Sequence, residues 1–151
     1  MMRSTSQALC LLVLAAAGAW ATYSWHPRAP ALYLVEEPLA EDEVSVEQVL
    51  GEWSGDVIWI DARTHERYAE GHVPGAHLLN EEGFHDQLFD LLDVLQTAER
   101  PVVIYCSGQR CEASRKIRTQ LRTQFPLEDV WILKGGWPAW VASKGPVEKG
   151  S

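Results

Sequence analysis

The stretch PVVIYCSGQRCEAS, residues 101–114, decides the fold. Residues 101–105 are apolar and rich in β-branched side chains, which predicts a buried strand that runs directly into Cys106. A short polar loop containing a glycine follows. Residues 112–123 then place Ala113, Ile117 and Leu121 on one face, which predicts a helix. A strand, a cysteine loop and a helix in this order indicate an α/β protein.

Outward from this stretch, predicted strands and helices alternate along the chain. Strands are predicted over residues 57–60, 76–79 and 130–133, and helices over residues 64–70, 82–97 and 137–143. Ser45, with Gln48 three residues later, is typical of a capping box and predicts another short helix. The alternation indicates a mostly parallel sheet covered by helices on both faces, with right-handed crossovers.

The composition limits the class of protein. The chain has 151 residues, of which 46% are hydrophobic, and this length suits one folded domain. A formal charge of -8 argues against nucleic acid as a partner. The three cysteines, Cys10, Cys106 and Cys111, are too few and too widely spaced for a disulfide scaffold.

Residues 1–25 are predicted to be a signal peptide or a membrane anchor. Arg3 supplies a positive start, and residues 8–21 are almost wholly apolar. The small residues around Trp20 suit a cleavage site, whereas the 18 residues from Ala8 to Trp25 approach the length of a retained span. Both interpretations place the domain on the non-cytoplasmic, periplasmic side of a membrane. Residues 26–43 are then expected to be a linker, and residues 44–148 the folded domain.

Cys106 is the candidate reactive group. Ligands of open α/β sheets bind at the carboxyl ends of the strands, where Cys106 is predicted to lie. The N-terminus of the following helix favours negative charge, so it is expected to lower the pKa of the thiol and make it a better nucleophile. A buried cysteine with no chemistry is the alternative.

Two further motifs carry a family resemblance. IDARTHERYAEGHVPGAHLLN, residues 60–80, and LKGGWPAWVASKGPV, residues 133–147, resemble the first signature and the closing segment of the rhodanese family. Cys106 stands where that family has its sulfur-carrying cysteine. The resemblance implies a five-stranded parallel sheet flanked by helices on both faces. It also implies a sulfurtransferase or persulfide carrier that needs no metal or organic cofactor.

The same resemblance implies the site and its partners. Cys106 is the expected catalytic residue, and it takes sulfur from a small donor such as thiosulfate. A thiophilic acceptor, such as cyanide, a small thiol or a thiol protein, then removes the sulfur. The backbone amides of the loop after Cys106 are expected to bind the persulfide; the loop consists of Ser107, Gly108, Gln109, Arg110 and Cys111.

The loop departs from the family pattern. The usual loop has a glycine at the third position after the cysteine and an arginine at the fifth. Here Gly108 is at the second position, Arg110 at the fourth and Cys111 at the fifth. The arginine that meets an anionic donor is therefore shifted, and either Arg110 reaches inward or Arg115 substitutes. Glu112 adds a negative charge that disfavours anionic donors, and it argues against a phosphatase.

Cys111 suggests a thiol-redox function as an alternative. It is a possible partner for Cys106 in a reversible disulfide, or a thiol that resolves an oxidised Cys106; it can equally well just pack at the start of the helix. A non-catalytic rhodanese-like module that binds a protein is the remaining alternative.

The other notable side chains are expected to be structural. Asp61 and Arg63 should tie loops together by hydrogen bonds, and His72 should hold its turn. Neither His72 nor His77 has a cysteine or carboxylate partner at a spacing typical of a metal site. Trp137 and Trp140 should pack the last helix and wall the pocket. The basic residues of the helix after the loop are expected to be solvated, with anion steering as the alternative; they are Arg115, Lys116, Arg118 and Arg122.

Overall fold

The computed structural model describes residues 2–25, 38–108 and 112–150. The chain divides into two units, residues 1–37 and 38–151. The first contains a single described helix, α1 (Met2–Trp25). Among the described residues, no helix is long and apolar enough to cross a membrane. The signal peptide or membrane anchor predicted for residues 1–25, and the periplasmic location, stay predictions.

The second unit is built on one parallel sheet. Its strands lie in the order β1-β5-β4-β2-β3, and every neighbouring pair is parallel. The strands are β1 (Glu43–Val44), β2 (Ile58–Asp61), β3 (His77–Leu78), β4 (Val102–Tyr105) and β5 (Val130–Leu133). β4 lies at the centre, where Ile104 is in register with Ile60 of β2 and Ile132 of β5. The predicted five-stranded parallel sheet is confirmed.

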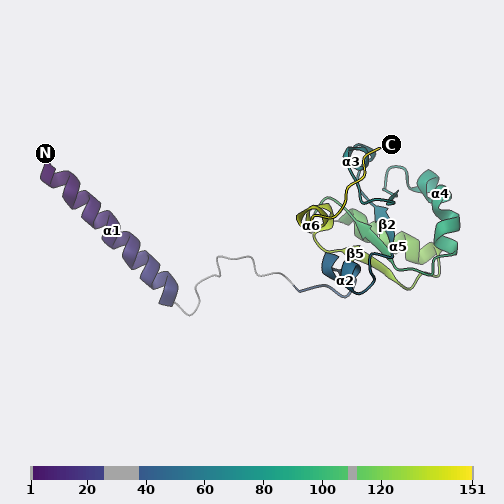
Figure 1. The fold of residues 1–151 in the computed structure, drawn as a ribbon, viewed down its shortest axis with the longest axis horizontal. Coiled ribbons are helices and arrows are strands. Elements are labelled where there is room, and N and C mark those ends of the chain that lie inside the picture. Colours follow the sequence, from purple (N-terminus) through teal and green to yellow (C-terminus); the bar gives the residue numbers. More distant parts are fainter. Residues whose placement is uncertain (1, 26–37, 109–111, 151) are drawn as a thin grey trace. The chain divides into compact units, whose positions relative to one another are not determined.

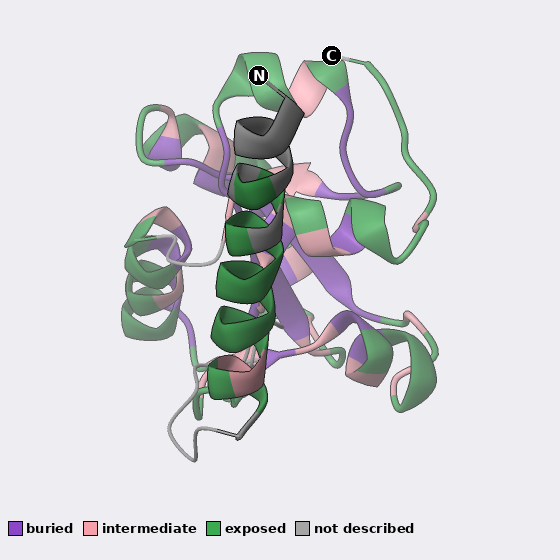
Figure 2. Ribbon diagram, turned by 90° about the vertical axis from the view of Figure 1, so that its left-hand side faces the viewer, coloured by how far each residue is buried: buried purple, intermediate pink, exposed green. Residues whose placement is uncertain are grey.

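Helices cover both faces of this sheet (Figure 1). They are α2 (Val46–Gly51), α3 (His65–Glu70), α4 (Phe84–Gln96), α5 (Glu112–Gln124) and α6 (Gly136–Ala142). The apolar faces of α4 and α5 pack on one side of the sheet, and α2 and α6 on the other. Figure 2 shows the result, with the outer surfaces of the helices exposed, and the central strands β2 and β4 are buried along their whole length. This burial is the main favourable contribution to folding.

Alternation along β4 divides its side chains between the two faces. Val102, Ile104 and the following Cys106 belong to the core beneath α4 and α5. Val103 and Tyr105 belong to the core beneath α2 and α6. Successive side chains of a strand point to opposite faces, and this alternation decides that the Cys106 side chain lies on the face covered by α4 and α5.

Most predicted elements are present, with ends that differ by one or two residues. The capping box at Ser45 is confirmed: its hydroxyl accepts from the Gln48 N–H at 3.1 Å, and the Gln48 side chain accepts from the Ser45 N–H. Thr64 precedes α3 as predicted, but its side chain makes no capping hydrogen bond. β1 was not predicted, because two residues carry no periodicity. It begins at Glu43, within the segment predicted as linker; residues 26–37 of that segment lie outside the described residues.

Candidate functional site

Cys106 lies at the carboxyl end of the central strand β4, as predicted. Its exposure is only 2%, and its Sγ lies 3.4 Å from the Gly108 carbonyl oxygen. Cys106 is disulfide-bonded in this structure. Ser107 is exposed and Gly108 half-buried, whereas Gln109, Arg110 and Cys111 lie outside the described residues. The predicted amide cradle is therefore described only at its first two positions.

The start of α6 holds the Cys106 backbone in place. The Trp137 N–H donates to the Cys106 carbonyl oxygen at 2.7 Å. Gly135 and Gly136 have positive φ values, 74° and 55°, which favour glycine. A Cβ on Gly136 would clash with the Cys106 carbonyl and would also lie 3.3 Å from the Gly108 nitrogen. Glycine at this position therefore lets the last helix approach the cysteine loop closely.

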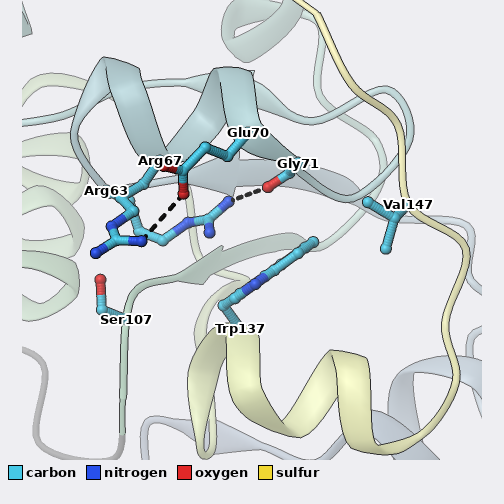
Figure 3. Close-up of a pocket in the computed structure, with 7 residues that line it drawn as sticks. All are labelled: Arg63, Arg67, Glu70, Gly71, Ser107, Trp137 and Val147. Carbon is cyan, nitrogen blue, oxygen red and sulfur yellow. Dashed lines mark hydrogen bonds and ion pairs between the residues drawn. The ribbon is translucent and has the colours of Figure 1, made fainter.

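A pocket of about 470 Å³ opens beside the loop. It is lined by Arg63, Arg67, Glu70, Gly71, Ser107, Trp137 and Val147 (Figure 3). These residues come from the ends of β2 and β4, from α3, from the start of α6 and from the segment after α6. Their convergence at one edge of the sheet follows from its parallel topology, since the carboxyl ends of all strands meet there.

Arg63 is a buried cation in the wall of this pocket. Its side chain forms a bidentate ion pair with Asp61, with a shortest distance of 2.6 Å, and donates to the Gly71 carbonyl at 2.7 Å. Burial opposes the charge of Arg63, but the hydrogen bonds and charge of Asp61 outweigh it, so the pKa of Arg63 is raised. The prediction that Asp61 and Arg63 tie loops together is confirmed, because they join the ends of β2 and α3.

Arg67 is the exposed cation of the pocket. Its guanidinium pairs with Glu70 at 3.0 Å, and both side chains are about two-thirds exposed, at 65% and 66%. Figure 3 shows the Ser107 hydroxyl directed toward the Arg67 guanidinium. Because Ser107 follows Cys106 directly, this exposed positive group lies near the start of the cysteine loop. It is suited to meet an anionic ligand, since an exposed arginine can exchange partners at little cost.

Arg115 does not take the role of a substitute arginine. Its guanidinium pairs with Asp42 at 3.1 Å and with Glu43 at 3.3 Å. These carboxylates precede and begin β1, so Arg115 is directed to that edge of the sheet and does not line the pocket. Two other cations of α5 also have partners: Lys116 pairs with Glu81 at 3.1 Å, and Arg118 donates to the Val130 carbonyl at 2.7 Å.

The expected structural roles of His72 and the two tryptophans are borne out. His72 stacks on Tyr68 with ring centres 3.8 Å apart, and its Nδ1 lies 2.9 Å from the Tyr68 carbonyl oxygen. Trp140 is buried in the core, and Trp137 forms a wall of the pocket. His77 is half-buried, and burial together with the charge of Arg100 lowers its pKa.

Arg67, Gly71 and Val147 were not singled out as functional residues from the sequence. Arg67 lies on α3, within the quoted motif of residues 60–80. Its place in that motif was the available signal. Val147 is the last residue of the other quoted motif, residues 133–147, but it stands 41 positions from Cys106, and only the folding of the chain brings it to the pocket.

Comparisons with known proteins agree with this geometry. The model of the rhodanese-like domain family matches residues 45–143. The HTH-type transcriptional regulator Rv0324 of Mycobacterium tuberculosis is 32% identical over 102 residues, which cover 65% of this chain and 40% of that protein. The chain thus spans well under half of that relative's length.

Two solved structures share the fold. The thiosulfate sulfurtransferase of Pseudomonas aeruginosa is 29% identical with a TM-score of 0.57, covering 78% of this chain and 21% of that one. The 3-mercaptopyruvate sulfotransferase SseA of Escherichia coli is 25% identical with a TM-score of 0.56, covering 74% and 53%. With the family model matching most of the folded unit, this chain belongs to the rhodanese-like domain family and is related to the sulfurtransferases.

Proposed function

We propose that this protein is a sulfurtransferase or persulfide carrier that holds a sulfane sulfur on Cys106. The observation that carries the proposal is the position of Cys106 at the carboxyl end of the central strand, next to a pocket with two arginines in its wall. Ser107 joins the two, because it follows Cys106 and lines the pocket. A donor held in the pocket would therefore lie next to Ser107, one residue from the cysteine that would receive its sulfur.

The α5 helix supports the reactivity of the sulfur. It has 13 residues and begins at Glu112, directly after the loop that contains Cys106. The N–H groups of its first turn and its dipole favour negative charge on the loop side. This environment favours an anionic sulfur in the loop, and a thiolate is the nucleophile that sulfur transfer requires.

The proposed reaction has two steps. In the first, the Cys106 thiolate attacks the outer sulfur of a donor such as thiosulfate; a new S–S bond forms on Cys106, and the S–S bond of the donor breaks to release sulfite. In the second, an acceptor thiolate attacks the outer sulfur of the Cys106 persulfide. The acceptor leaves as a persulfide and Cys106 returns as a thiolate. The likeness to a thiosulfate sulfurtransferase supports the choice of donor.

The test is the intact mass of the full chain. The protein is reduced, freed of reductant and treated with thiosulfate or with glutathione persulfide. We expect a gain of about 32 Da, one sulfur atom, that an added thiol removes. Cys106→Ser should abolish the gain, and the matched control Cys10→Ser should retain it. A wild-type mass that neither donor changes would contradict the proposal.

A thiol-redox function is the second candidate, and the disulfide on Cys106 favours it. In this function Cys106 cycles between a disulfide and a dithiol, with a partner thiol pair taking or giving two electrons and two protons. Cys111, five positions away, is the partner that the sequence suggests. Oxidation of the reduced chain would then lower its mass by about 2 Da in a manner that requires both cysteines. Loss of this change in Cys10→Ser instead of Cys111→Ser would contradict the pairing.

A further inference from the structure

Residues 146–150, here named the strap, cross the end of α3 and border the pocket. The strap is held at several points. The Trp140 indole N–H donates to the Pro146 carbonyl at 2.9 Å. His72 and Glu148 exchange two backbone hydrogen bonds of 2.9 Å as an isolated antiparallel bridge. The Glu148 carboxylate also accepts from the Gly75 N–H at 3.2 Å. The strap is therefore a defined part of the pocket wall.

Val147 is the strap residue that faces the pocket. It precedes Glu148, whose side chain is directed to the Gly75 turn, and neighbouring side chains of an extended segment point to opposite sides. The Val147 Cγ1 lies so near Gly71 that a Cβ on Gly71 would be 3.0 Å from it. Val147 is 47% exposed, and its exposed part lines the pocket.

Val147 and Ser107 lie on opposite sides of the pocket in Figure 3, with Trp137 between them. A small inorganic donor that reaches Cys106 beside Ser107 therefore has no need to contact Val147. An organic donor several times larger extends across the pocket to the strap. The pocket volume of about 470 Å³ falls in the range of sites that enclose organic ligands.

We infer that Val147 is a specificity-determining residue that limits the size of the donor able to reach Cys106. This inference rests on the proposed sulfur transfer at Cys106. Val147 has no charge and no polar group, so it acts through its volume alone. Arg67 is unchanged in variants at position 147, so its attraction for each donor stays as in the wild type. Changing the volume at position 147 should therefore change the ratio of the two loading rates.

The experiment measures rate constants for persulfide formation on the full reduced chain, with thiosulfate as the small donor and glutathione persulfide as the large one. Val147→Trp should slow loading from glutathione persulfide about tenfold or more and change loading from thiosulfate less than about twofold. Val147→Ala should move the ratio in the opposite direction. The matched control is Val141→Trp, because Val141 on α6 is 48% exposed and does not line the pocket.

The outcomes separate the two proposals. If neither donor loads the wild-type chain, the proposed function fails. If the wild type is loaded but both Val147 variants keep the wild-type ratio, or Val147→Trp slows both donors equally, the inference about Val147 is overturned and the proposed function stands. If Val147→Trp does not fold, the ratio in Val147→Ala decides. A control variant that shifts the ratio as strongly as Val147→Trp also overturns the inference.

Discussion

The guanidinium carbon of Arg63 lies 4.3 Å from the centre of the Trp137 ring. The same guanidinium carbon lies 5.4 Å from the centre of the Tyr105 ring, and the two rings are stacked at 6.1 Å. This contact joins the end of β2 to the start of α6, whose backbone holds the Cys106 carbonyl. A cation over an aromatic face is favourable, and more so where both groups are shielded from water. Trp137 therefore contacts both Arg63 in the pocket wall and the backbone of Cys106.

Asp61→Asn should destabilise the fold strongly. Asp61 is fully buried and carries the charge that compensates Arg63, so its removal leaves an unpaired buried cation. We expect the free energy of unfolding to fall by about 3–5 kcal/mol. Urea denaturation measures this change. Asp56→Asn breaks the exposed pair with Arg100 and serves as the control, with an expected change within about 1 kcal/mol. Equal effects of the two variants would contradict the structural role of the buried pair.

Gly136→Ala should disturb the cysteine loop. The added Cβ would clash with the Cys106 carbonyl, and the backbone has a φ of 55°. Overpacking of this kind costs about 1–3 kcal/mol, in addition to the strain of the positive φ. Gly75→Ala is the matched control, because Gly75 has a φ of 72° but no atom within 4 Å of a Cβ. Thermal unfolding should show a larger loss in Gly136→Ala, and persulfide loading should fall only in that variant.

Arg67→Gln should slow loading from thiosulfate about tenfold with little change in stability, since the side chain is exposed and its pair with Glu70 contributes little. Rising ionic strength should lower the rate of the wild type relative to that of the variant, because salt screens the local attraction that the variant lacks. Mass spectrometry of samples quenched at successive times, at two salt concentrations, gives the loading rate and its dependence on salt. Lys116→Gln removes the same charge from α5 outside the pocket, so an equal effect there would point to net charge instead of a local contact.

His77 should contribute a pH dependence of stability. Burial, followed by the charge of Arg100, lowers its pKa in the folded state below 6.5, so the unfolded chain binds more protons on acidification. The contribution of His77 to the free energy of unfolding is fully present above pH 6.5. It is lost as the pH falls from 6.5 to the lower pKa of His77 in the folded state.

The measurement compares urea unfolding of the wild type and His77→Gln at about pH 8 and about pH 5.5. The loss of stability between the two pH values should be smaller in the variant. His65→Gln, at an exposed position in the first turn of α3, should lose as much as the wild type. A variant loss equal to the wild-type loss would show that His77 titrates alike in both states.

The order of strands and helices was predictable because it depends on short-range patterns. Each of these patterns involves residues close together in the sequence. They are the apolar run before Cys106, the spacing of Ile117 and Leu121, and the Ser45 capping box. These patterns placed Cys106 at the end of a strand and before a helix, as the structure has it. They also marked the buried Asp61–Arg63 pair, since both residues lie within one motif directly after a strand.

The site depended on contacts between distant segments. Arg115 was a reasonable substitute for the shifted loop arginine, yet Asp42 and Glu43 attract it to the β1 edge, a strand too short to predict. Gly136 approaches the cysteine loop only because α6 packs against the end of β4, and Val147 reaches the pocket only because the strap pairs with the segment after α3. The sequence by itself therefore determined the α/β order and the candidate for the reactive sulfur, that of Cys106. Only the tertiary structure decided which side chains surround that sulfur, because the parallel sheet brings the carboxyl ends of its strands to one edge.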